Sequence, residues 1–208
     1  MIELLVVIAV IAILATLAYP VYTGVQERAK ITKDMNNLRQ VGIATQTYLN
    51  DNDGVLFTAG GIWMTQLHPK YMPAWSVFQS PFDTRAASEL DASAPISYGL
   101  NGNTKGGGPS IAGLSMDRIT NPSVFIIFAP AQAAGPTVAF AGGTAAAVTV
   151  YKNINPAAFG GTHSSRTKIN ALFADWHAEN MDWSKFILDT DLNDPSAALR
   201  WDPYLGYP

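Results

Sequence analysis

The apolar N-terminal run constrains this chain more than any other feature. Residues 1–19 read MIELLVVIAVIAILATLAY, apolar except for Glu3 and the weakly polar Thr16. A helix needs roughly 17 to 25 apolar residues to cross a bilayer, so this run is long enough to span one. A carboxylate in such a segment is costly in lipid and is commonly functional. We therefore expect a membrane-spanning helix whose single acid has a specific role.

The chain then continues as a polar helix with one apolar stripe. Apolar residues recur at steps of three and four, as on one face of an α-helix. They are Ile31, Met35, Leu38, Val41, Ala44 and Tyr48. We expect the charged residues on the other faces, where Lys30 and Asp34 form an i,i+4 pair of opposite sign. The turn-forming residues 50–54 (NDNDG) are expected to end the helix.

Pro20 and Gly24 mark a weak point in this long helix. Proline removes one backbone hydrogen bond and clashes with the carbonyl four residues earlier, which belongs to Thr16. Gly24 is a poor helix former and follows within about one turn. We predict that the helix is interrupted near Pro20. The alternative is a simple kink in one continuous helix.

The rest of the chain predicts a β-rich head. Residues 55–123 are rich in turn formers, with one short helix expected within 62–71. Strands are expected at residues 123–129, 137–140, 145–151, 168–173 and 177–181, and the tail from 183 is expected to be loop. The predicted fold is α+β: a helix over about residues 1–50 packs on a C-terminal antiparallel sheet with long loops. The predicted division is an apolar helix, 1–24, and a head, 25–208, comprising an amphipathic helix (25–50) and a β-rich region (51–208).

Composition argues against several classes of function. The formal net charge of −3 provides no basic field for nucleic acid. The absence of cysteine excludes disulfides and thiolate chemistry. The glycine-rich stretches lack the Lys-Ser/Thr of a phosphate-binding loop, and no nucleophile motif is present. We therefore predict that the chain is not an enzyme and has no catalytic residues.

Residues 2–14 (IELLVVIAVIAIL) resemble the N-terminal signature of type IV pilins and of the pseudopilins of type II secretion. Glu3 corresponds to the glutamate of that signature, and Pro20 to its helix-interrupting proline. The resemblance implies that Glu3 neutralises the N-terminal ammonium of an adjacent subunit. It also implies that helix is lost around residues 12–23 in the fibre. The alternative for Glu3 is an interfacial acid at the membrane surface.

The resemblance assigns further residues to filament assembly. Pro20 and Gly24 are expected to act with Glu3. The apolar residues expected in the filament core are Leu4, Leu5, Val7, Ile8, Ile11, Leu14 and Leu17.

The head also resembles one subgroup of pilin-like proteins. Residues 48–54 (YLNDNDG) and 80–83 (SPFD) match stretches of that subgroup, with Ser80 in place of a cysteine. Residues 163–177, which contain His163, Asp175 and His177, are similar to its H-x9-D-G-H motif but two residues longer. Trp176 stands where the motif has glycine, so we expect a longer or different hairpin turn. Zinc binding by the three motif residues is an alternative to a hydrogen-bonded hairpin.

Two acidic stretches are candidates for calcium binding. Residues 51–54 resemble a fragment of a calcium loop but lack its bidentate glutamate. The other candidate ligands are Asp189, Asp191 and Asn193, because major pseudopilins bind calcium near their C-terminus. Solvated turns are the favoured interpretation of both, and no cofactor is otherwise expected.

The implied function is that of a structural subunit of an extracellular type IV pilus-like filament. The chain would wait in the inner membrane and then join identical copies in a helical filament at the cell surface, aided by the pilus assembly machinery. The alternatives are a pseudopilin of a secretion apparatus, a membrane-tethered binding head and, less favoured, a surface-anchored hydrolase. A secretory signal peptide cut after Ala18 would leave Glu3 unexplained.

Overall fold

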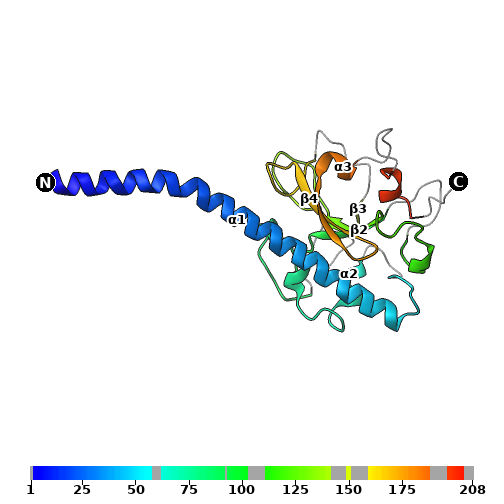
Figure 1. Ribbon diagram of the computed structural model, residues 1–208. Coiled ribbons are helices and arrows are strands. Elements are labelled where there is room, and N and C mark those ends of the chain that lie inside the picture. The colour runs from blue at the N-terminus through cyan, green and yellow to red at the C-terminus, as the bar shows by residue number, and fades with distance from the viewer. Residues whose placement is uncertain are drawn as a thin grey trace.

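The computed structural model describes residues 2–57, 62–91, 93–102, 111–141, 149–150, 159–187 and 196–203. Helix α1 (Ile2–Asp51) dominates it (Figure 1). The first half of α1 projects from the head, and the second half lies along it. The predicted α+β fold is confirmed, because this helix packs on a C-terminal sheet that is mainly antiparallel.

The sheet has five strands in the order β3-β1-β2-β4-β5. The pairs β1–β2, β2–β4 and β4–β5 are antiparallel, whereas β3 pairs with β1 in parallel. The strands are β1 (Tyr98–Asn101), β2 (Ile126–Pro130), β3 (Thr149–Val150), β4 (Lys168–Phe173) and β5 (Ala178–Asp182). Strand β2 is buried along its whole length, and this central place follows from its β-branched and aromatic composition.

The second half of α1 is amphipathic, as predicted. Leu38, Val41, Ala44 and Tyr48 are buried against the head. The helix ends at Asp51, where the N–H of Gly54 donates 2.9 Å to the carbonyl of Leu49. Gly54 has a φ of +72°, a conformation that glycine adopts without strain.

The predicted interruption near Pro20 is wrong for the single chain. Helix α1 runs through Pro20 without a break and bends between its free half and its head-bearing half (Figure 1). A proline removes one hydrogen bond, whereas an interruption would sacrifice several, so a bend is the smaller loss. The alternative of one continuous helix is therefore observed in the single chain, and the loss of helix over residues 12–23 in the fibre stays a prediction.

The hydrophobic core lies between α1, the sheet and a set of short helices. These helices are α2 (Trp63–Leu67), η2 (Trp75–Phe78), η3 (Met116–Arg118), α3 (Trp183–Ile187) and η4 (Ala198–Arg200). Helix α2 confirms the short helix expected within 62–71. The prediction of a loop tail is wrong at α3 and η4, where the buried Trp201 donates from Nε1 to the Phe186 carbonyl at 2.9 Å.

The strands match the sequence prediction unevenly. Strand β4 has the predicted bounds, and β5 begins one residue later than predicted. The strand expected at 137–140 is absent, because Phe140 forms only an isolated bridge with Gln132. Strand β1 lies in a region that was expected to be loop. Of the expected strand at 145–151, only residues 149–150 lie in the described part of the chain.

Candidate functional site

The first half of α1 is an exposed apolar surface. Its most apolar stretch has a mean hydropathy of 2.7, and none of that stretch is buried. By length and composition, the helix could cross a membrane. The proposed filament-core residues are all exposed: Leu4 70%, Leu5 61%, Val7 54%, Ile8 53%, Ile11 60%, Leu14 60% and Leu17 67%. Contiguous apolar surfaces of this size mark sites of protein or membrane interaction.

The residues assigned to assembly also lie clear of the head. Glu3 is exposed in the first turn of α1, where a carboxylate is favoured by the helix dipole. Gly24 is exposed, and a Cβ added there would meet nothing within 4 Å. Pro20 lies on the same free segment. All three are available to a partner, and their roles in assembly stay predictions.

Glu27 marks the point where α1 meets the head. Its carboxylate accepts a 2.7 Å hydrogen bond from the backbone N–H of Ser164. Ser164, Ser165 and Arg166 have φ values of 52°, 55° and 65°, which form a left-handed turn. Each such residue costs about 1–2 kcal/mol, so the turn persists only where its surroundings hold it. Glu27 is one of the groups that hold it.

Asp34 is a buried carboxylate at the centre of the helix–head interface. It is 0% exposed and accepts hydrogen bonds from Ser80 Oγ (2.5 Å), Tyr98 OH (2.7 Å) and Asn170 Nδ2 (2.8 Å). Burial raises the pKa of Asp34, and the three hydrogen bonds oppose that rise. The predicted exposed pair with Lys30 is therefore wrong. Asp34 lies on the same face of α1 as Leu38 and Val41, which the apolar pattern did not indicate.

Hydrogen bonds continue from Asp34 across the sheet. Asn170 on β4 accepts a 2.7 Å bond from Asn180 Nδ2 on β5. Asn180 Nδ2 also lies 2.5 Å from His163 Nε2, and His163 Nδ1 lies 2.9 Å from Thr162 Oγ1. A network of this kind, largely shielded from solvent, fixes the relative positions of the elements that contribute to it.

Ser80, which stands in place of the subgroup's cysteine, connects α1 to the head by hydrogen bonds. Its hydroxyl donates to Asp34, and its backbone N–H donates to Ser97 Oγ at 2.9 Å. Ser97 donates in turn to Asp83, which also holds Arg85 at 2.6 Å. The SPFD segment is therefore tied to α1 by hydrogen bonds.

His163 is a core residue of the head. It is 3% exposed and stacks on Phe82 with the ring centroids 5.4 Å apart. Burial lowers its pKa, which favours the neutral imidazole near neutral pH. A neutral ring that accepts at Nε2 from Asn180 donates at Nδ1 to Thr162, so both nitrogens are satisfied.

The β4–β5 hairpin has a three-residue loop, residues 174–176. Phe173 and His177 close it with a 3.0 Å backbone bond from Phe173 N to His177 O. Trp176 has a φ of 73°, so it occupies the left-handed position that completes a turn of this length. This agrees with the expected longer turn. A Cβ at Gly42 would meet Trp176 Cε3 at 3.5 Å, so the indole packs on α1 where α1 has no side chain.

The three motif residues do not converge on one site. His177 Nδ1 lies 2.5 Å from Asp175 Oδ1, and the His177 ring stacks on Phe173 at 4.3 Å. His163 instead contacts Asn180, Thr162 and Phe82. Among the described residues, no group of three or more His, Cys, Asp or Glu side chains is placed to hold a metal ion. The geometry favours the hydrogen-bonded hairpin over zinc.

The calcium candidates receive no support from the described residues. Asp51 Oδ2 accepts from Lys70 Nζ at 2.7 Å and from Tyr71 OH at 2.9 Å. These contacts tie the carboxylate of the 51–54 stretch to the segment after α2. Asp189, Asp191 and Asn193 lie outside the described residues.

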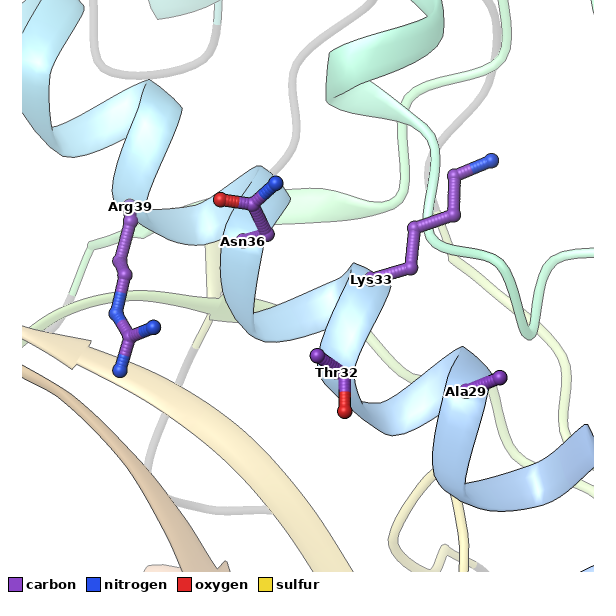
Figure 2. A pocket seen from close by; sticks show the side chains of 5 residues that line it. All are labelled: Ala29, Thr32, Lys33, Asn36 and Arg39. Carbon is purple, nitrogen blue, oxygen red and sulfur yellow. The ribbon is translucent and has the colours of Figure 1, made fainter. Parts of the chain in front are cut away.

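A shallow groove crosses the outer face of α1. It is lined by Ala29, Thr32, Lys33, Asn36 and Arg39. Figure 2 shows the long side chains of Lys33 and Arg39 extending in different directions from the helix. Both cations lie off the apolar stripe, as the sequence predicts.

Comparison with known proteins produced no match to this chain from a family model, a curated protein or a solved structure. The likeness to pilins therefore consists of the architecture, in which the second half of a long, apolar N-terminal helix packs on an antiparallel sheet.

Proposed function

We propose that this chain is a structural subunit, a pilin, of an extracellular type IV pilus-like filament. The observation that carries the proposal is the division of α1 into two halves. The half before Glu27 is apolar and exposed, and the half after it has one face buried against the head. A helix built in this way presents its free half to a membrane or to copies of itself.

Burial energy explains both states of the free half. Removing a twenty-residue apolar helix from water is worth tens of kcal/mol, at roughly 25 cal/mol per Å². Lipid buries this apolar surface before assembly, and neighbouring α1 helices bury it in a filament. Transfer from one to the other yields little net burial, so the assembly machinery supplies the work.

Glu3 gives the packed helices a register. It is the sole charged residue of the segment 2–26. In a bundle of apolar helices its carboxylate needs a cationic partner, and the N-terminal ammonium of an adjacent subunit is suitable. A misaligned helix would leave the charge buried and unpaired.

The rigid anchorage of α1 supports the same function. Asp34 and its three donors hold the second half of the helix on the sheet. Heads fixed in this way would surround a central bundle of helices and form the outer surface of the fibre.

Electron microscopy of sheared surface material tests the proposal. The full chain is produced in a cell that has a type IV assembly machinery and lacks its own major pilin. The expected result is filaments whose reconstruction shows the first halves of α1 side by side in the core. A chain found only in inner-membrane fractions, with a secretion defect on deletion, would indicate a pseudopilin instead.

A further inference from the structure

Three cations follow the apolar half of α1 and have no assigned role. Arg28, Lys30 and Lys33, here called the basic collar, are exposed. None has a carboxylate partner among the described residues. The nearby acids are engaged elsewhere, since Glu27 binds the N–H of Ser164 and Asp34 is buried. A net-acidic chain thus places an unpaired positive cluster at one level of its helix.

The basic collar lies at the depth of lipid headgroups. Val25 is the last residue of the exposed apolar series. At 1.5 Å per residue, Arg28 and Lys33 lie about 4.5 Å and about 12 Å beyond it. The headgroup layer on each side of a bilayer is roughly 5–8 Å thick, and the field of its phosphates extends about 8 Å further. The collar lies within this range.

The basic collar is spread over two sides of the helix. At about 100° per residue, Lys30 and Lys33 lie about 60° apart, whereas Arg28 lies about 140° from Lys33 and about 160° from Lys30. Glu27 and Asp34 face the head. A membrane surface meets both sides of the helix at once, whereas one docked protein would meet only one of them.

Aromatic residues mark the same boundary. Tyr19 and Tyr22 are 71% and 62% exposed, close to the end of the apolar segment. Tyrosine is enriched at the level of the lipid headgroups because its ring is apolar and its hydroxyl is polar. The order along the helix is therefore apolar segment, tyrosines and then cations.

We propose that the basic collar binds the phosphates of anionic phospholipids on the head side of the membrane while residues 2–25 span it. Each cation near such a surface contributes about 1 kcal/mol of attraction, and the same charges attract neutral lipid far less. The collar would fix the depth of the helix and the approach of the head to the membrane. The proposal requires membrane insertion and does not depend on filament formation.

Lipid selectivity of the full chain tests this proposal. The chain is reconstituted in phosphatidylcholine vesicles that contain spin-labelled phosphatidylglycerol or spin-labelled phosphatidylcholine. Electron paramagnetic resonance then gives the fraction of each label that is immobilised by the protein. The expected preference for phosphatidylglycerol is about threefold or more at low salt, falling toward onefold at high salt.

Two triple variants distinguish the effect of the basic collar on the lipid preference from the effect of net charge. Arg28→Gln/Lys30→Gln/Lys33→Gln should abolish the preference. Arg39→Gln/Arg118→Gln/Lys185→Gln removes the same charge from other exposed positions and should retain it. Three results would overturn the proposal. They are an equal loss of the lipid preference in both variants, survival of the preference in the collar variant, and no preference in the unmodified chain. Collar-dependent self-association without lipid selectivity would also overturn it, because it would assign the cations to an acidic protein surface.

Discussion

The Tyr98 hydroxyl donates a 2.7 Å hydrogen bond to Oδ1 of Asp34, joining β1 to α1 between two residues that are 0% exposed. Ser80 and Asn170 bring donors from a loop and from β4 to the same carboxylate. Burial raises the pKa of Tyr98 well above its ordinary value, so its hydroxyl remains a donor. One side chain of α1 thus connects the helix to three parts of the head.

Asp34→Ala should destabilise the head by about 3–5 kcal/mol, because it leaves three buried donors without an acceptor. Denaturant unfolding of the full chain in detergent, followed by tryptophan fluorescence, measures the change. Asp182→Ala is the matched control. The Asp182 carboxylate is exposed and pairs with Lys168 at 2.9 Å, so its removal should matter far less. Equal effects of the two substitutions would remove the special role of Asp34.

The contribution of Asp34 to stability should depend on pH. Its pKa is raised in the folded state, so the folded state binds this proton more tightly than the unfolded state does. The part of the contribution that is linked to protonation is therefore fully present below about pH 4 and is lost as pH rises through the folded-state pKa. The difference in unfolding free energy between the unmodified chain and Asp34→Asn should fall over that range. A difference that grows with pH would show that the folded-state pKa is depressed instead.

At residue 176, glycine should be a better replacement than alanine. Both Trp176→Gly and Trp176→Ala remove the indole that packs at Gly42. Alanine keeps the strain of a φ near 73°, whereas glycine relieves it, by about 1 kcal/mol. Thermal unfolding of the two variants should therefore rank glycine above alanine. The reverse order would mean that the loop changes conformation once the indole is removed.

Deletion of residues 1–24 should give a soluble and folded head. The apolar segment makes no buried contact with the head, and the interface begins near Glu27. The free energy of unfolding should remain within about 0.5 kcal/mol of that of the full chain. Circular dichroism and denaturant titration measure it. Insoluble aggregate would show that the boundary is misplaced.

Glu3→Ala should leave membrane insertion intact and abolish or strongly slow filament formation. The substitution removes a charge that costs free energy in lipid, and with it the charge that sets the register between copies. Carbonate extraction measures insertion, and electron microscopy of sheared material measures assembly. Glu179→Ala, which removes an exposed acid from β5, serves as the control and should assemble normally. Normal filaments from Glu3→Ala would refute the role assigned to Glu3.

Periodic patterns in the sequence predicted the long elements of this fold. The apolar stripe of α1 is buried where expected, and the run KINALF forms β4 with the predicted bounds. Both signals are local, because they arise from residues that share one face or one strand. Strand β1 escaped prediction because Tyr98–Asn101 contains glycine and asparagine, which are poor strand formers. Its pairing with β2 supplies the stability that its composition lacks.

The polar interface could not be predicted from local sequence. Asp34 occurs among exposed charges of the helix, and its partners lie 46, 64 and 136 residues away. No spacing rule connects positions so distant. The left-handed turn at Ser164–Arg166 was missed for a related reason. None of its three residues is glycine, and a contact with Glu27, 137 residues distant, holds it.

The buried carboxylate has a mechanical consequence for a rod that is pulled. Rotating α1 by one residue would turn Asp34 by about 100° away from its three donors, and sliding the helix by one turn would also leave those donors without an acceptor. Tension applied at the N-terminal end would therefore pass into the middle of the sheet instead of shearing the helix from its surface. The second half of α1 and the head would move as one rigid body under tension, and the helix would flex at the bend ahead of Glu27.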